Sequence, residues 1–323
     1  MLLTTLGGRR PAHAFVFTGP AGVGKRTMAR AVAAFVNCDQ PDKNSGDACG
    51  VCPSCRKMAA GTHPDCVVVQ PSGSGIRISQ VREMIRVLDF PPHQGKNRVV
   101  ILEQAHTLGR EAANSLLKTL EEPPPSNFFI LAADSGRALL PTIRSRCQTV
   151  LFAPLRSEQV VSFLRREDSD LTPEQAEALA TISGGSIGRA RELAGEETGQ
   201  VRRDLFMTLF AADEQTDPVD IRLYGLARQV AAHKELTGRI CEFLTSWHRD
   251  LLLLASGGRQ EHLMNRDFSH LLAACAARRK EDSDFFQKIG YIRQAERELA
   301  RNCHAAHVFL VLFYRLVDTP WNR

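Results

Sequence analysis

The first half of the chain alternates short apolar runs with segments of helical period. Five runs up to about Pro154 are typical of buried strands: Ala14–Phe17, Cys66–Val69, Val99–Leu102, Phe128–Ala132 and Val150–Phe152. The first four are each followed by a polar turn and a stretch whose apolar residues repeat every three or four positions. Apolar strands alternating with helices are typical of a parallel sheet covered on both faces. We therefore predict an α/β domain over residues 1–154.

The second half of the chain is helical almost throughout. Residues 155–200 hold three short amphipathic segments, for which Ser157 and Thr172 suit the N-cap positions. Residues 201–323 also have a helical pattern, with the clearest break at 212–218 and a strongly apolar last helix that must be buried in protein. We predict a small helical domain over 155–200 and an all-α domain over 201–323.

Composition excludes several classes of protein. The chain is 43% hydrophobic and 24% charged, and its 41 Lys and Arg against 36 Asp and Glu give a formal charge of +5. This balance permits contact with nucleic acid but does not by itself indicate it. No stretch of the sequence approaches the ~20 apolar residues of a membrane span, and the start lacks the apolar core of a signal peptide. We expect a cytoplasmic protein without membrane contact.

Four of the nine cysteines form a dense cluster after the first predicted helix. Cys38, Cys49, Cys52 and Cys55 have the spacing C-x₁₀-C-x₂-C-x₂-C. An odd total with one cluster favours a reducing compartment and a metal site over disulfides. The C-x₂-C steps let thiolates close on one ion at about 2.3 Å, so we expect structural Zn²⁺ in a module over 38–55. An iron–sulfur cluster and unrelated free thiols are the alternatives.

A phosphate-binding loop with one defect follows the first strand. Residues 19–25 fit G-x-x-x-x-G-K, in which backbone N–H groups curl around a phosphate and the lysine reaches the terminal phosphates. The next position should be a Ser or Thr that holds Mg²⁺, but it is an arginine, which has no acceptor oxygen. We expect poor metal-assisted chemistry and leave ATP and Mg²⁺ binding open. The candidate nucleotide contacts are Gly19, Gly22, Gly24, Lys25, Arg26 and Thr27.

A second motif of P-loop ATPases is altered at the end of the third predicted strand. In such enzymes this strand ends in an Asp that helps to hold Mg²⁺, followed in many by a Glu that polarises the attacking water. This chain has Glu103 and Gln104 at these positions. Glu103 can still reach a metal, whereas Gln104 cannot accept a proton. Taken alone, the pair also fits a strand end with solvated polar residues.

The run from His106 to Cys147 contains the strings AANSLLKTLEEPP and TIRSRC. With these strings the chain resembles the clamp-loader branch of AAA+ proteins from about Ala14 to Glu192. Within the bacterial branch it is most similar to the delta-prime subunits of DNA polymerase III, because of the GKR break, the Glu-Gln pair and GGSIGRA. The resemblance implies an AAA+ P-loop core with a zinc module, then a helical lid and a helical collar.

The resemblance also implies roles for two arginines. In the family, the arginine of Ser-Arg-Cys, here Arg146, reaches ATP bound by a neighbouring subunit as an arginine finger. A guanidinium suits this role because it is always charged and pairs with phosphate in a fork. Arg189 in GGSIGRA matches the lid arginine that senses nucleotide in its own subunit. From the Ser-Arg-Cys triplet alone, a surface arginine at a strand edge is the simpler interpretation.

A basic segment is a candidate DNA contact. Arg77, Arg82 and Arg86 lie in and beside a helix predicted to begin near Ser79. Free N–H groups at a helix N-terminus bind phosphate, and clamp loaders direct such helices at duplex DNA. The candidate contacts are Arg77, Ser79 and Arg82, and the alternative is a solvated basic face.

The resulting hypothesis is a non-motor, stator-like clamp-loader subunit. It would help to load the sliding clamp onto primed DNA at a nucleoid-associated bacterial replisome. Its implied partners are the gamma/tau and delta subunits in a ring, primer-template DNA and, indirectly, the sliding clamp. The alternative from the enzyme class is an active gamma/tau-like ATPase. A zinc-bearing P-loop protein outside replication is a third interpretation.

Overall fold

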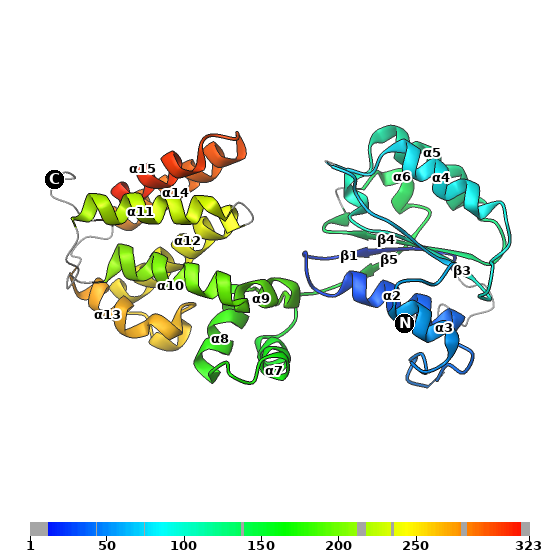
Figure 1. Ribbon diagram of the computed structural model, residues 1–323, viewed down its shortest axis with the longest axis horizontal. Helices are drawn as coiled ribbons and strands as arrows, with labels where there is room; N and C mark the ends of the chain where they lie inside the picture. The colour runs from blue at the N-terminus through cyan, green and yellow to red at the C-terminus, as the bar shows by residue number, and fades with distance from the viewer. Residues whose placement is uncertain are drawn as a thin grey trace. The chain divides into compact units, whose positions relative to one another are not determined.

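The computed structural model describes residues 12–42, 44–73, 75–136, 139–211, 218–233, 236–278 and 283–317. The chain divides into two compact units, Met1–Pro154 and Leu155–Arg323 (Figure 1). The first unit combines a sheet with helices, and the described residues of the second are helical apart from their connections. The predicted α/β class with a following helical region is confirmed.

The first unit contains a sheet of five parallel strands in the order β2-β3-β4-β1-β5. The strands are β1 (Ala14–Thr18), β2 (Cys66–Val69), β3 (Arg98–Leu102), β4 (Asn127–Ala133) and β5 (Gln148–Leu151). All five predicted strands are therefore present. β1 lies between β4 and β5, with Thr18 opposite both Ala133 and Leu151. The loops that leave β1, β3 and β4 all lie at the carboxyl ends of the parallel strands. In open α/β sheets this is the end where ligands bind.

The prediction that all five strands are buried is wrong for β2 and β5. Each of them lies at an edge of the sheet with a strand on one side only, and their side chains are mostly half-buried or exposed. Leu151 in β5 is 82% exposed. The last strand also spans Gln148–Leu151 rather than the predicted Val150–Phe152. Burial depends on the order of strands, which apolar runs do not reveal.

Helices cover both faces of the sheet. They are α2 (Lys25–Asn37), α3 (Pro53–Ala59), α4 (Ile78–Leu88), α5 (Arg110–Glu121) and α6 (Pro141–Arg144). α2 and α3 lie on one face, and α4, α5 and α6 on the other (Figure 1). Successive side chains of a strand point to opposite faces, so Phe15 packs towards α2 while Val16 belongs to the core beneath α4 and α5.

The second unit is built from helices around one apolar core. They are α7 (Ser157–Glu167), α8 (Pro173–Ile182), α9 (Ile187–Ala194), α10 (Glu196–Phe210), α11 (Val219–Ala232), α12 (Thr237–Ala255), α13 (Ser269–Arg278), α14 (Ser283–Ala300) and α15 (Ala305–Leu316). Most of its buried apolar residues form one cluster from Val160 in α7 to Leu316 in α15. Because this cluster continues across residue 200, the predicted lid and collar boundary stays a prediction. The predicted break at 212–218 lies mostly outside the described residues.

The first residues of α7 and α8 show whether Ser157 and Thr172 are the N-caps of these helices, as predicted. Thr172 caps α8 as predicted, since its Oγ1 accepts the Gln175 N–H at 3.2 Å. The assignment of Ser157 is wrong by one residue, because α7 begins at Ser157 and Arg156 is its N-cap. The Gln159 side chain accepts the Arg156 N–H at 3.1 Å and so fixes the earlier start.

Candidate functional site

The phosphate loop connects β1 to α2 at the carboxyl ends of the strands. Gly22 and Gly24 have φ angles of 74° and 97°, in the left-handed region that favours glycine. A Cβ on Gly19 would lie 2.1 Å from the Phe152 carbonyl oxygen after β5. These positions therefore need glycine for backbone shape and for close approach, whether or not a phosphate binds.

The side-chain ammonium group of Lys25 is fully hydrogen-bonded within the chain. Its buried Nζ donates to the carbonyl oxygens of Gly19 and Pro20 at 2.5 and 2.6 Å. It also lies 3.0 Å from the Oδ1 of Asp134, which follows β4. An ammonium group has three donors, and all three have protein partners here. A phosphate at this loop would have to replace one of them.

The residue after Lys25 is paired with the acid at the end of β3. Arg26 Nε lies 2.6 Å from Glu103 Oε1, and Gln70 Nε2 donates to the other carboxylate oxygen at 3.1 Å. Glu103 is buried, whereas the Arg26 side chain is about half exposed. In an intact P-loop ATPase these two positions share Mg²⁺. In this chain they face each other as a cation and an anion.

This ion pair meets a requirement of the buried carboxylate. A charged group away from water needs a counter-charge or hydrogen-bond partners. Arg26 supplies a positive charge 2.6 Å from one carboxylate oxygen of Glu103. Sequence reasoning identified Arg26 as unable to bind a metal but missed its partner. The available signal was the pair of opposite charges at the two metal-holding positions of the motif.

The other two motif positions lie near this pair without joining it. Gln104 is exposed, has a left-handed backbone with φ 50°, and begins the short turn after β3. Its amide cannot take a proton from water. Thr27 is exposed on the first turn of α2, one position beyond the residue that faces Glu103.

Arg146 is held by an acid from the LLKTLEEPP string. It lies between α6 and β5, and its Nε donates to Glu121 Oε1 at 2.6 Å. Its Nη2 also contacts that oxygen, and its Nη1 donates to the Thr142 carbonyl oxygen at 2.8 Å. Glu121 is the last residue of α5. The two strings that carry the family resemblance are thus joined by an ion pair that sequence reasoning missed.

Arg189 lies in the second unit and has a partner there. Its Nη2 is 2.6 Å from Glu242 Oε2 on α12, and Arg239 pairs with the same carboxylate oxygen at 3.0 Å. The Ser186 side chain caps α9 by accepting the Arg189 N–H. Sensing a nucleotide would require Arg189 to exchange Glu242 for a phosphate, and this role stays a prediction.

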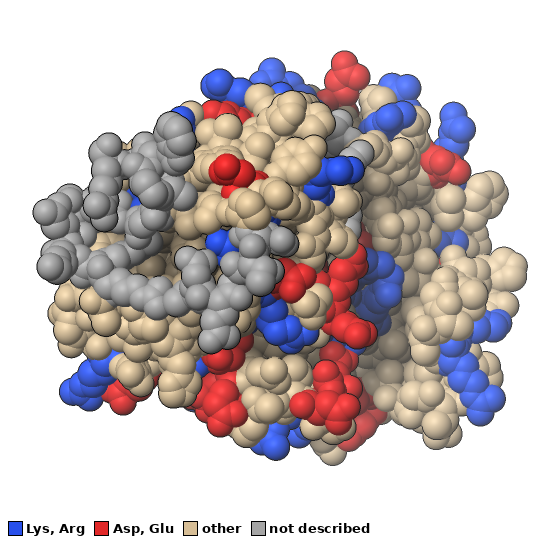
Figure 2. Space-filling model, turned by 60° about the vertical axis from the view of Figure 1, so that its left-hand side comes forward, with Lys and Arg blue, Asp and Glu red and all other residues tan. Residues whose placement is uncertain are grey.

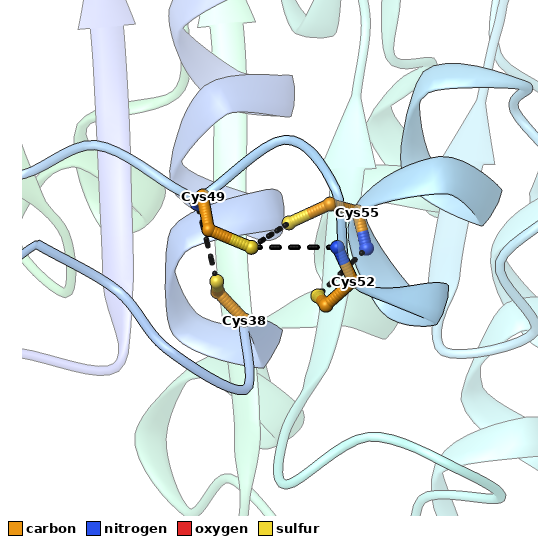
Figure 3. A group of neighbouring side chains, drawn as sticks. All are labelled: Cys38, Cys49, Cys52 and Cys55. Atoms are coloured by element: carbon orange, nitrogen blue, oxygen red, sulfur yellow. Dashed lines mark hydrogen bonds between the residues drawn. The ribbon is translucent and has the colours of Figure 1, made fainter.

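The four clustered cysteines converge on one point (Figure 3). Cys38 directly follows α2, Cys49 lies in the following loop, and Cys52 and Cys55 lie at the start of α3. Their sulfur atoms are all within 4.8 Å of one another, and those of Cys49 and Cys55 are 4.0 Å apart. Metal–sulfur bonds of about 2.3 Å in a tetrahedron put sulfurs about 3.8 Å apart. The cluster fits one metal ion, whereas an iron–sulfur cluster would insert several atoms between its thiolates.

Backbone groups around the cluster favour thiolates. The N–H groups of Cys49, Cys52 and Cys55 point at the sulfurs of Cys38, Cys49 and Cys52, at 3.3, 3.4 and 3.4 Å. N–H groups of Val51 and Cys52 lower the pKa of Cys49 to about 7, while burial raises the pKa of Cys55 to about 12. Such N–H···S bonds orient ligands and stabilise their charge.

The candidate DNA contacts lie together at the start of α4. Arg77 precedes the helix, and Ser79 and Arg82 lie on its first two turns, all three of them exposed. Gln80 ties this end of the helix to the sheet, since it accepts the Arg77 N–H at 3.0 Å and donates to the Gln70 carbonyl oxygen at 2.8 Å. Figure 2 turns the side of Figure 1 that carries α11 and α13 towards the viewer, and basic and acidic side chains are interspersed on that face, so this view does not bear on α4. DNA contact at α4 stays a prediction.

Within the described residues, no helix has the length and apolar character needed to span a membrane.

Comparisons with known proteins point to DNA replication. Residues 1–156 match the family model described as DNA polymerase III, delta subunit. The DNA polymerase III subunit delta' of Yersinia pestis is 40% identical over 267 residues, which cover 80% of this chain and 75% of that protein. The delta' subunit of Pseudomonas aeruginosa is 38% identical over 204 residues, or 62% of each chain. The tau subunit of Escherichia coli is 32% identical over 57% of this chain and 29% of its own length. The match to the Pseudomonas protein thus spans less than two thirds of that relative.

The Arg26–Glu103 ion pair predicts that substitutions of these two residues have non-additive effects on the free energy of unfolding. Arg26→Met removes the nearest cation of the buried carboxylate and leaves only the more distant Arg30, and a poorly partnered buried group costs roughly 1–3 kcal/mol. Adding Glu103→Met removes the stranded charge, so the double variant should be less destabilised than the two single variants summed. Urea unfolding of the four chains measures this difference.

Arg30→Met provides the matched control for this cycle. Arg30 Nη2 lies 3.9 Å from the same Glu103 oxygen, and its side chain is half exposed, as that of Arg26 is. A coupling between Arg26 and Glu103 no larger than that between Arg30 and Glu103 would contradict the assigned pairing.

Proposed function

The chain belongs to the family of DNA polymerase III delta' subunits, and on this premise we propose that it is a non-motor, stator-like subunit of the bacterial clamp loader. It would act in the cytoplasm at the replisome on the nucleoid. Its partners would be gamma/tau and delta subunits in a ring, with primer-template DNA and, indirectly, the sliding clamp. The observation that carries the non-motor role is the Arg26–Glu103 ion pair.

Three features support the absence of ATP hydrolysis by this subunit. Hydrolysis needs a metal that bridges the phosphates and a group that orients the attacking water. Arg26 takes the counter-ion position at Glu103, and Gln104 cannot act as a base. Lys25 already has three protein partners. The glycines could still hold a phosphate, but the chemical step lacks its metal.

The alternative is a gamma/tau-like ATPase. The intact glycine pattern and the similarity to the tau subunit of Escherichia coli favour it. A metal site at Glu103 would require the Arg26 guanidinium to swing away, which leaves no hydroxyl at position 26 to share the ion. We therefore favour the non-motor, stator-like role over an active ATPase.

A subunit without its own chemistry can still complete a neighbouring site. We assign this role to Arg146, which would contact the phosphates of ATP bound by the adjoining motor subunit. Its side chain is about 31% exposed, so it can be reached from outside the chain. Arg189 would sense nucleotide at the chain's own loop if a phosphate binds there.

Two further sites have proposed roles in this subunit. The exposed group of Arg77, Ser79 and Arg82 at the start of α4 would contact phosphates of primer-template DNA. The four cysteines would hold one structural Zn²⁺, since a closed four-thiolate site leaves no open position for catalysis. The module lies beside the sheet rather than within it, and its role would be to fix the loop between α2 and α3.

The zinc proposal predicts one Zn²⁺ per chain. Elemental analysis should find that ion, and Cys52→Ser should lose it, while Cys303→Ser should keep it because Cys303 is exposed far along the sequence. Chelation should expose residues 38–55 to protease and leave the sheet folded, because the core does not depend on the module. Iron in place of zinc, or no metal, would overturn the assignment. Global unfolding on chelation would contradict the structural role proposed for the module.

The arginine-finger proposal predicts a defect in the assembled loader. Arg146→Ala should assemble normally with the motor and delta subunits but slow DNA-stimulated ATP hydrolysis at the adjoining site. Arginine fingers contribute about 10³–10⁵-fold in phosphoryl transfer, and the total rate should fall by less because only one site loses its finger. Steady-state hydrolysis by the reconstituted loader measures the loss.

Arg144→Ala is the matched control, since Arg144 is an exposed arginine two positions earlier. It should keep the full rate. If Arg146→Ala retains both ATPase and clamp-loading rates, Arg146 is a surface arginine and the finger role is wrong.

A further inference from the structure

The Arg146 guanidinium has little free hydrogen-bonding capacity in this chain. Nε and Nη2 are both directed at Glu121 Oε1, with Nε at 2.6 Å. Nη1 donates to the Thr142 carbonyl oxygen at 2.8 Å and to Ser145 Oγ at 3.3 Å. Four of the five N–H groups of the guanidinium are therefore used within the subunit. The edge formed by Nε and Nη2, which would grip a phosphate as a fork, is the edge that Glu121 covers.

We propose that Glu121 retains Arg146 on its own subunit and that the phosphate of a neighbour's nucleotide must displace Glu121 before Arg146 can act. The proposal rests on the finger role assigned to Arg146 above. Glu121 is then a positioning residue: it touches no substrate and acts only through the arginine. The ligand class that competes with it is a nucleoside triphosphate bound by an adjoining subunit.

The position of Glu121 supports a role directed at Arg146. Glu121 is the last residue of α5, and the C-terminal end of a helix disfavours a negative charge. The carboxylate therefore gains nothing from its own helix. Its partner is Arg146 of the TIRSRC string, which follows α6.

The strength of the pair suits a reversible contact. The two side chains are 31% and 48% exposed, so solvent screens their attraction. Exposed ion pairs stabilise a protein only weakly, and a nucleotide phosphate carries more negative charge than one carboxylate. The phosphate can thus replace Glu121 once the neighbouring subunit brings it within reach. A pair this weak would keep Arg146 on its own subunit until the phosphate arrives, and the phosphate could then displace Glu121.

The test is Glu121→Gln in the reconstituted loader, with ATP hydrolysis measured with and without primer-template DNA. The substitution keeps the size of the side chain and removes its charge. Loss of an exposed ion pair corresponds to about a two- to fivefold change, so the DNA-free rate should rise by about that factor. The DNA-stimulated maximum should stay unchanged, whereas a merely structural defect would lower it. Glu121→Ala should behave in the same way.

Glu122→Gln is the matched control. Glu122 is the next residue, it is also exposed, and among the described residues it forms no ion pair. Its substitution should leave both rates as they are. Combining Glu121→Gln with Arg146→Ala should cancel the gain, because the released group is then absent.

The outcomes separate this proposal from the finger role. If Arg146→Ala slows the loader but Glu121→Gln leaves the DNA-free rate unchanged or lowers it, the retaining role is wrong and the finger stands. A gain that persists in the double variant also overturns the retaining role, since it does not pass through Arg146. If Arg146→Ala changes no rate at all, both proposals fail.

Discussion

A buried carboxylate needs a counter-charge or hydrogen-bond partners, and in this chain the nearest cation to Glu103 is Arg26. This one pairing explains why two motif positions depart together from the P-loop pattern. A hydroxyl at position 26 and an acid at position 103 would share a metal, whereas an arginine and an acid pair as opposite charges. The glycines stay as they are because backbone shape and the approach to Phe152 require them, independently of any nucleotide.

Arginines paired with glutamates recur at the proposed functional points of this chain. Arg26 pairs with Glu103 at the two altered metal-holding positions of the motif, and Arg146 pairs with Glu121 at the surface proposed to meet a neighbour. The two pairs differ in burial, since Glu103 is almost enclosed and Glu121 is about half exposed. The enclosed pair suits a permanent substitution, and the exposed pair suits a contact that can be exchanged.

Local patterns predicted much of this structure. Apolar runs revealed all five strands, and the cysteine spacing revealed a cluster whose sulfurs do converge. What the sequence did not reveal depends on which strands, loops and helices are neighbours. Glu103 as the partner of Arg26 follows from loops that meet at one edge of the sheet. The exposure of Leu151 follows from the edge position of β5, and the Glu121 contact follows from the packing of α5 against α6.

The measurement that tests the central claim most directly is the Mg²⁺ dependence of nucleotide binding and hydrolysis by the purified chain. The ion pair predicts that Mg²⁺ does not tighten ATP binding and that the chain alone hydrolyses no ATP above background. Arg26→Ser, which frees Glu103 and restores a hydroxyl, should make binding depend on Mg²⁺. Tighter binding by the wild-type chain with Mg²⁺, or turnover comparable to that of a clamp-loader motor, would contradict the account.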